Sequence, residues 1–213
     1  MTESKSNLLI DNNGGLSDTF AKMQKGLDPD LAIEIGAHAA EFSNFMAKEY
    51  GIKALAFEVG KDIYNLYKDT MHSLVSYINC AISDADGTAT FFVRESSTKP
   101  FNGIKEVIGD FAAPYEKVNS YKLDTYVKDY EFSNACLWID VEGASREVLV
   151  GATETLKKTS SIFMETEDRS WWKDQWLTED VINYLESLGF TKIASERVYG
   201  MQQNIIFIKN ELL

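Results

Sequence analysis

The sequence predicts an α/β fold, in which one mostly parallel sheet carries helices on both faces. Short apolar stretches alternate with segments of helical periodicity from Leu31 to the end of the chain, which is typical of strand–helix–strand units. The stretch Ala135–Val141 is almost entirely apolar, as expected of a strand covered on both faces. With 213 residues, the chain has the length of one large domain.

The first two strand–helix units follow one another closely. Leu31–Ile35 is predicted to be a strand that runs into a glycine turn, and Ala39–Tyr50 a helix that buries its aromatic and methionine side chains. Lys53–Phe57 is predicted to be the second strand because four of its five residues are apolar. Asp62–Met71 follows as a helix, with apolar residues at helical spacing.

A hairpin is predicted next. Val75–Ile82 is expected to form the third strand, and Asp84–Gly87 has the residues of a tight turn that leads into a strand at Thr88–Val93. Residues 94–120 contain Ser, Thr and Pro in a run and are expected to be a long loop. A loop of this length in a compact domain is usually functional, so we predict that it is an acceptor loop or lid.

The end of the chain is expected to complete the sheet. After Ala135–Val141, Ser161–Met164 is predicted to be a further parallel strand. A helix begins at Thr178, which is a suitable N-cap, and ends at Gly189. Thr191–Val198 and Asn204–Lys209 are separated by a short turn, which indicates an antiparallel pair.

The polar first thirty residues are set apart from this pattern. Only Thr19–Lys25 has weak helical character, so we expect residues 1–30 to be an N-terminal arm or cover and residues 31–213 to be the domain itself. No linker or internal repeat divides the rest of the chain.

Composition narrows the classes of function. The net charge of -12 argues against a nucleic-acid partner, because phosphate binding needs a basic surface. No apolar run is long enough for a membrane span, and the N-terminus lacks a secretory signal. Cys80 and Cys136 lie in apolar runs without metal-type spacing, which favours buried thiols in a reducing cytoplasmic location. Nothing in the sequence indicates the oligomeric state.

Carboxylates cluster where the predicted strands end. In doubly wound folds, ligands bind at the carboxyl ends of the strands, and charged residues directly after apolar stretches usually have a partner or a task. These strand-end residues are Glu34, Glu58, Asp84, Asp140, Glu142, Glu165 and Glu167. We therefore expect a binding and catalytic site at this edge of the sheet.

The turn Gly36-Ala37-His38 and Glu58 predict the type of cofactor. Glu58 follows the second strand and is placed to accept hydrogen bonds from the two ribose hydroxyls of a nucleoside. The turn lacks the second and third glycines that let a backbone approach a pyrophosphate. A nucleoside cofactor without phosphates, such as S-adenosylmethionine (SAM), suits it better than a nicotinamide dinucleotide, although an oxidoreductase remains an alternative.

The whole set of motifs resembles the FkbM-type family of SAM-dependent methyltransferases. The matching segments are Ile33-Glu34-Ile-Gly36-Ala-His38, Ala56-Phe57-Glu58, Asn79-Cys-Ala81-Ile-Ser83-Asp84, Lys122-Leu123-Asp124-Thr125 and Ile139-Asp140-Val141-Glu142-Gly143-Ala144. The resemblance implies a Rossmann-like class I methyltransferase domain, with a seven-stranded sheet whose last strand is antiparallel. It also implies methyl transfer to an oxygen, often a hydroxyl of a sugar or polyketide.

The resemblance also assigns parts of the cofactor to residues. Glu34, Gly36, Ala37 and His38 would border the methionine part, where His38 replaces the family's usual asparagine. Glu58 and Val59 would border the ribose. The segment from Asn79 through Ala81 to Asp84 would border the adenine, and Asp140 would lie beside the sulfonium.

Methyl transfer to a hydroxyl requires a group that removes the proton. Asp140 is the first candidate for this base, followed by Glu142 and Glu165, and His38 is an alternative whose structural role is favoured. A divalent metal is a further alternative, since Asp140, Glu165 and Glu167 offer oxygen ligands that suit Mg²⁺. No ligand spacing is diagnostic, so a metal is not favoured.

Three tryptophans and one tyrosine are candidates for acceptor binding. Trp171, Trp172 and Trp176 follow the predicted strand Ser161–Met164, and Tyr115 lies in the predicted loop. Aromatic faces stack on sugar rings, which favours a sugar hydroxyl of a glycan or glycosylated metabolite as the acceptor, with packing in the core as the alternative. A polyketide or phenolic acceptor remains an alternative, as does a non-catalytic nucleoside-binding module.

Overall fold

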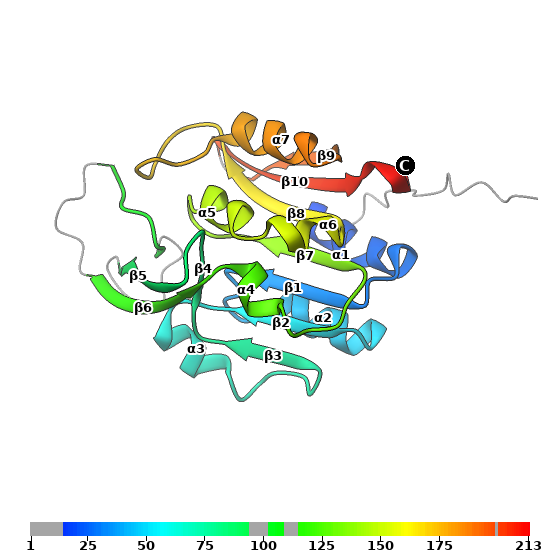
Figure 1. Ribbon diagram of the computed structural model, residues 1–213, viewed down its shortest axis with the longest axis horizontal. Coiled ribbons are helices and arrows are strands. Elements are labelled where there is room, and N and C mark those ends of the chain that lie inside the picture. The colour runs from blue at the N-terminus through cyan, green and yellow to red at the C-terminus, as the bar shows by residue number, and fades with distance from the viewer. Residues whose placement is uncertain (1–14, 94–101, 109–114, 199) are drawn as a thin grey trace, which may run out of the picture.

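A computed structural model describes residues 15–93, 102–108, 115–198 and 200–213. The main sheet has seven strands in the order β3-β2-β1-β7-β8-β10-β9. β3, β2, β1, β7 and β8 are mutually parallel, whereas β10 is antiparallel to β8 and to β9. The predicted α/β fold with an antiparallel last strand is therefore confirmed, and Figure 1 shows helices on both faces of the sheet.

The strands of the main sheet agree with most of the sequence predictions. Their bounds are β1 Leu31–Ile35, β2 Lys53–Phe57, β3 Val75–Ile78, β7 Ala135–Ile139, β8 Thr159–Glu167, β9 Phe190–Arg197 and β10 Gln202–Lys209. β1 and β2 have the predicted bounds, because both are buried strands that end next to sharp turns. β8 is longer than predicted, so Glu165 and Glu167 lie within its last residues rather than after it.

The predicted hairpin is wrong. Residues 75–82 form two strands, β3 and the short β4 (Ala81–Ile82), and β4 belongs to a second, three-stranded sheet in the order β4-β6-β5. β5 (Gly87–Phe92) pairs antiparallel with β6 (Tyr115–Tyr121) and not with β4. β6 therefore also corrects the end of the predicted loop 94–120, of which residues 94–101 and 109–114 lie outside the described residues.

The predicted helices are present, although α2 begins two residues later and α3 ends four residues earlier than predicted. Their bounds are α1 Leu16–Leu27, α2 Glu41–Tyr50, α3 Lys61–Tyr67, α4 Leu123–Val127, α5 Ser145–Val150, α6 Thr153–Lys157, α7 Thr178–Ser187 and the 3-10 helix η1 Asn210–Leu212. The N-cap position of α7 is occupied by Leu177 rather than by the predicted Thr178. The N–H of Leu177 donates to the carboxylate of Asp180 at 2.9 Å. Gly189 follows it with a φ of 81°, as predicted for a C′ glycine.

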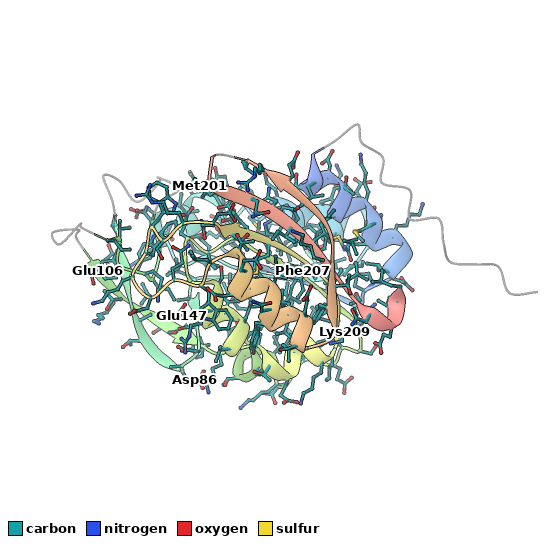
Figure 2. The ribbon with its side chains drawn as sticks, turned by 90° about the horizontal axis from the view of Figure 1, so that it is seen from above. Asp86, Glu106, Glu147, Met201, Phe207 and Lys209 are labelled. Atoms are coloured by element: carbon teal, nitrogen blue, oxygen red, sulfur yellow. The ribbon has the colours of Figure 1, made fainter. Side chains whose placement is uncertain are left out.

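Alternation along the strands divides the core between the two faces of the sheet. Ile33, Leu137 and Phe207 point toward α4, α5, α6 and α7, and all three are fully buried. Neighbouring residues such as Ala32 and Phe163 point the other way, toward α1 and α2. Figure 2 shows Phe207 in the middle of the molecule. The described residues contain no helix long and apolar enough to cross a membrane.

The second sheet lies beyond the carboxyl ends of the parallel strands (Figure 1). A parallel sheet offers its ligand-binding crevice at this edge. β4, β5 and β6 therefore form an additional wall at the place where the strand-end carboxylates gather.

Candidate active site

A cavity of about 350 Å³ opens at the carboxyl ends of β1, β2 and β7, a size typical of small-molecule sites. Sequence analysis named seven of its lining residues: Gly36, His38, Glu58, Val59, Ala81, Asp140 and Glu142. Ile63 and Phe91, which were not predicted, also line the cavity, as does the segment 102–104 of the predicted acceptor loop 94–120. These residues come from α3, β5 and a loop, whose approach to the site depends on long-range contacts.

Gly36 allows the closest approach in the site. Its φ is 80°, and a Cβ at this position would lie 1.6 Å from the carbonyl oxygen of Asp140. The N–H groups of Gly36 and Ala37 donate to the carbonyl of Phe57 at 3.0 and 2.9 Å. The turn is thus packed directly between the ends of β2 and β7, and only glycine fits there.

Glu58 is held by two backbone groups at the floor of the cavity. Its Oε2 accepts the N–H of His38 at 2.9 Å, and its Oε1 accepts the N–H of Gly60 at 2.6 Å. The side chain is buried, and this burial raises the pKa of Glu58 above its ordinary value. Each carboxylate oxygen can accept a second hydrogen bond, which is the capacity needed for a pair of neighbouring hydroxyls.

His38 adopts a left-handed conformation, with a φ of 43°. Its N–H is bound by Glu58, and its carbonyl accepts a hydrogen bond from the hydroxyl of Tyr77. The imidazole ring lies 5.4 Å from the ring of Tyr67 and is exposed at the edge of the cavity. Both backbone groups of His38 are therefore fixed, while its side chain faces the opening.

The end of β3 is tied to the end of β2 by an amide side chain. Asn79 donates from Nδ2 to the carbonyls of Glu58 and Val59 at 2.8 and 3.1 Å. Asn79 does not line the cavity, whereas Ala81 does. Asp84 lies farther out and forms an ion pair with Arg146 at 3.0 Å.

Glu34 faces away from the cavity. It is 4% exposed, and its Oε2 accepts the N–H of Ser43 in the first turn of α2 at 2.8 Å. Burial raises the pKa of this carboxyl from 4.5 to about 7. The arrangement satisfies one of the free N–H groups at the start of the helix.

Asp140, Glu142 and Glu165 form a carboxylate cluster next to the turn. One oxygen of each side chain lies within 4.8 Å of the others. Burial raises the pKa of Asp140 to about 6, although His38 opposes the shift. Burial and the neighbouring Asp140 raise the pKa of Glu165 to about 8.

The cluster differs in one member from the candidate metal ligands predicted from the sequence, which are Asp140, Glu165 and Glu167. Glu142 takes the place expected for Glu167, whose carboxylate instead accepts a hydrogen bond from Gln175. A proton shared within such a cluster, or a cation, would relieve the repulsion between its members.

The segment Asn102–Ile108 crosses the cavity as a strap. Residues 102–104 line the cavity, and a Cβ on Gly103 would lie 3.3 Å from the Cβ of Glu142. The strap is joined to β5 through Phe92, whose N–H donates to the carbonyl of Gly103 at 2.8 Å. On its other side, Lys105 forms an ion pair with the nearly buried Glu147 at 2.9 Å. Figure 2 shows Glu147 and Glu106 toward the same end of the molecule.

The three tryptophans have different surroundings. Trp176 packs against Tyr184 of α7, with the ring centroids 5.0 Å apart, and Trp172 is buried against Gly143. Trp171 is 45% exposed beside the strap, with Arg169 at 5.3 Å from its ring. None of the three lines the cavity itself. The side chain of Tyr115 lies outside the described part of the chain.

Several solved structures are similar to this chain at low sequence identity, and those with a TM-score above 0.5 share its fold. Magnesium protoporphyrin IX methyltransferase from Synechocystis PCC 6803 with bound SAM is 8% identical, with a TM-score of 0.52 over 91% of this chain and 77% of that chain. EvdMO1 is 11% identical, with a TM-score of 0.53 over 90% and 40%. A putative tRNA (m1A22) methyltransferase from Streptococcus pneumoniae is 11% identical, with a TM-score of 0.48 over 84% and 64%. The chain spans less than two thirds of the last two.

Comparison with protein families identifies the chain more directly. No curated protein matches the sequence. A family model described as the methyltransferase FkbM domain matches residues 34–192, from the end of β1 to the start of β9. The match includes the turn, Glu58 and the carboxylate cluster, and it covers more than half of the chain. The protein therefore belongs to the FkbM methyltransferase family.

Proposed function

We propose that the protein is a SAM-dependent O-methyltransferase that methylates a sugar hydroxyl of a glycan or glycosylated metabolite. The observation that carries the proposal is the position of Asp140. Its backbone packs against the cofactor turn at Gly36, and its carboxylate belongs to a cluster of which two members, Asp140 and Glu142, line the cavity. A base is thus adjacent to the place where the methyl donor would lie.

The shape of the cavity supports the fit of the cofactor. Glu58 has the free acceptor capacity to bind the two ribose hydroxyls. Cys80, Ala81, Ile82 and Phe91 form an apolar wall next to it, which suits the flat face of adenine. Gly36 and His38 also line the cavity, where they would border the methionine part. The bound cofactor would supply an electrophilic methyl group on a sulfonium.

Asp140 is the preferred base because of its position: it lines the cavity directly beside the turn at Gly36, whereas Glu165 does not line the cavity. Burial raises the pKa of both carboxyls, and the neighbouring Asp140 raises the pKa of Glu165 further. A hydroxyl oriented in the cavity would give its proton to Asp140 as the oxygen attacks the methyl carbon. Glu142 and His38 would then orient groups around the acceptor without taking the proton.

The acceptor proposal is supported by Trp171. An exposed indole beside the strap offers a flat apolar face of the kind that stacks on the C–H face of a sugar ring, and Arg169 lies close to it. The strongly acidic chain, with a net charge of -12, does not favour a nucleic-acid acceptor. A polyketide or phenolic acceptor is the second candidate, since the same indole can stack on an aromatic ring.

Asp140→Asn tests the proposal. The substitution should lower kcat by about 10² to 10⁴-fold, the usual contribution of a general base, while SAM affinity measured by calorimetry changes by less than about tenfold. Asp129→Asn, at an exposed position away from the cavity, is the matched control and should have wild-type activity. Full activity of Asp140→Asn would exclude Asp140 as the base.

A screen of acceptors tests the substrate class. Purified protein, SAM and a panel of free sugars, glycosides and phenolic compounds should give a mass increase of one methyl group on sugars rather than on phenols. Activity in the presence of EDTA tests the metal alternative, because Mg²⁺-dependent transfer would be lost. SAM binding without methylation of any compound would favour a non-catalytic nucleoside-binding module.

A further inference from the structure

We propose that Gln175 is a positioning residue for the acceptor: it holds the loop 168–177 so that Trp172 rests on Gly143 and the strap Asn102–Ile108 lies over the cavity. The inference rests on the proposed function, because it gives this loop the task of shaping the acceptor side of the site. Gln175 does not line the cavity, so its effect would pass through the residues that it holds.

The hydrogen bonds of Gln175 define its role. Its Oε1 accepts the N–H groups of Trp171 at 2.9 Å and Trp172 at 3.2 Å, and its Nε2 donates to Oε2 of Glu167 at 2.5 Å. Gln175 is 8% exposed and Glu167 is 2% exposed. One buried amide thus joins the last residue of β8 to two successive backbone groups of the loop.

The amide of Gln175 can satisfy these hydrogen bonds in one orientation only. Two backbone donors meet at its oxygen, so its nitrogen must face the carboxylate. An apolar side chain of the same length would leave the buried N–H of Trp172, the partly buried N–H of Trp171 and the buried carboxylate of Glu167 without these partners. Buried polar groups without partners are costly, so the loop would move to satisfy them with water.

Movement of the loop would reach the site through Trp172. A Cβ on Gly143 would lie 2.6 to 2.8 Å from atoms of the Trp172 ring, which therefore packs directly on the backbone next to Glu142. Trp172 also forms a backbone bridge to Val107 of the strap. The loop and the strap are thus one connected layer, and its inner side rests on the Asp140–Gly143 turn.

Two backbone hydrogen bonds make up this bridge between Val107 and Trp172. The N–H of Ile108 donates to the carbonyl of Trp171 at 3.0 Å, and the N–H of Lys173 donates to the carbonyl of Glu106 at 2.8 Å. The cofactor turn at Gly36 and the carboxylate of Glu58 receive no contact from Gln175. Loss of Gln175 should therefore affect acceptor turnover more than affinity for the cofactor.

Gln175→Met is the first test, with Gln24→Met as its matched control. Gln24 is also a buried glutamine with hydrogen bonds at both ends of its amide, to Phe20 and Ser161, but it lies on the α1 face of the sheet. Gln175→Met should lower kcat/KM for the best sugar of a free monosaccharide panel by at least about tenfold and leave Kd for S-adenosylhomocysteine within about threefold. Gln24→Met should leave both unchanged.

Hydrogen exchange and fluorescence give readouts that do not depend on the acceptor. In Gln175→Met, the backbone amides of Trp171 and Trp172 should exchange at least about tenfold faster, and acrylamide should quench more tryptophan emission. Unchanged exchange and unchanged kcat/KM would overturn the proposal, even if the protein methylates sugars as proposed. Absence of S-adenosylhomocysteine binding and turnover in the wild-type protein would instead overturn the proposed function.

A swap of the two side chains separates positioning from general loss of stability. Gln175→Glu alone keeps an acceptor for the tryptophan N–H groups but places two carboxylates against each other, so kcat/KM should fall. Combining Gln175→Glu with Glu167→Gln restores a donor and an acceptor in reversed order. The double variant should regain most of the kcat/KM that Gln175→Glu loses, and failure to regain it would contradict a positioning role.

Discussion

Glu34→Gln should make the stability of the protein less dependent on pH. Glu34 is buried below the start of α2, and its pKa is raised from 4.5 to about 7 in the folded protein. Between these values the unfolded chain releases a proton that the folded protein keeps. The contribution of Glu34 to stability is therefore full below the unfolded pKa and is lost as the pH rises toward about 7.

The size of the effect follows from the shift. One pKa unit corresponds to about 1.4 kcal/mol, so a rise from 4.5 to about 7 amounts to about 3 to 4 kcal/mol in total. Most of it, about 2 to 3 kcal/mol, is lost between about pH 5 and pH 8.5. The glutamine amide is neutral at every pH and keeps an oxygen for the N–H of Ser43.

Urea unfolding of both proteins at several pH values measures this difference. The free energy of unfolding of Glu34→Gln minus that of the wild type should rise by about 2 to 3 kcal/mol from about pH 5 to pH 8.5. Taking the difference removes the contributions of Glu58, Asp140 and Glu165, which titrate in both proteins. Glu49→Gln, at an exposed position of the same helix, should show no such rise. A difference that stays flat for Glu34→Gln would refute the reasoning.

Three further predictions concern the site. Gly36→Ala should destabilise the protein by more than about 4 kcal/mol or prevent folding, since its Cβ would meet a carbonyl at 1.6 Å. Gly51→Ala, also at positive φ but with open space around it, should cost only about 1 to 2 kcal/mol. Similar losses of stability in the two variants would contradict the role of the close contact. Lys105→Met, which breaks an ion pair 12% exposed on both sides and so loosens the strap, should lower kcat/KM for the acceptor more than it raises Kd for SAM measured by calorimetry, whereas Lys173→Met, in an exposed pair, should change neither. The rate kcat/KM should fall about tenfold per pH unit below about 6, the pKa of Asp140, and a rate profile flat from pH 5 to 8 would argue against Asp140 as the base.

Local sequence patterns predicted the strands that carry the cofactor turn. β1 and β2 have their predicted bounds because buried apolar strands that end in a glycine turn are determined by nearby residues. The strand-end carboxylates were found for the same reason, since each directly follows an apolar stretch. Asp140 and Glu142 were therefore predicted to be close together, and the structure brings them within one cluster with Glu165.

Features set by long-range contacts were missed. The apolar run Val75–Ile82 is divided between two sheets because Asn79 turns the chain and bonds to the backbone at the end of β2. β6 has only one aliphatic residue, Val118, so its sequence predicts a loop, although it pairs along its length with β5. Whether the side chain of Glu34 points toward α2 or toward the cavity depends on the face of the strand that it occupies. The turn motif does not determine this face.

The contact between Gly36 and the carbonyl of Asp140 responds to substitution differently from the segments around the acceptor side of the site. This contact between the cofactor turn and the turn that carries the proposed base is made by main-chain atoms, so it is insensitive to most substitutions elsewhere in the protein. The strap and the tryptophan loop, in contrast, are held by side chains such as Lys105 and Gln175. Acceptor preference can therefore drift, or be redesigned, through these two segments while the reaction centre stays intact.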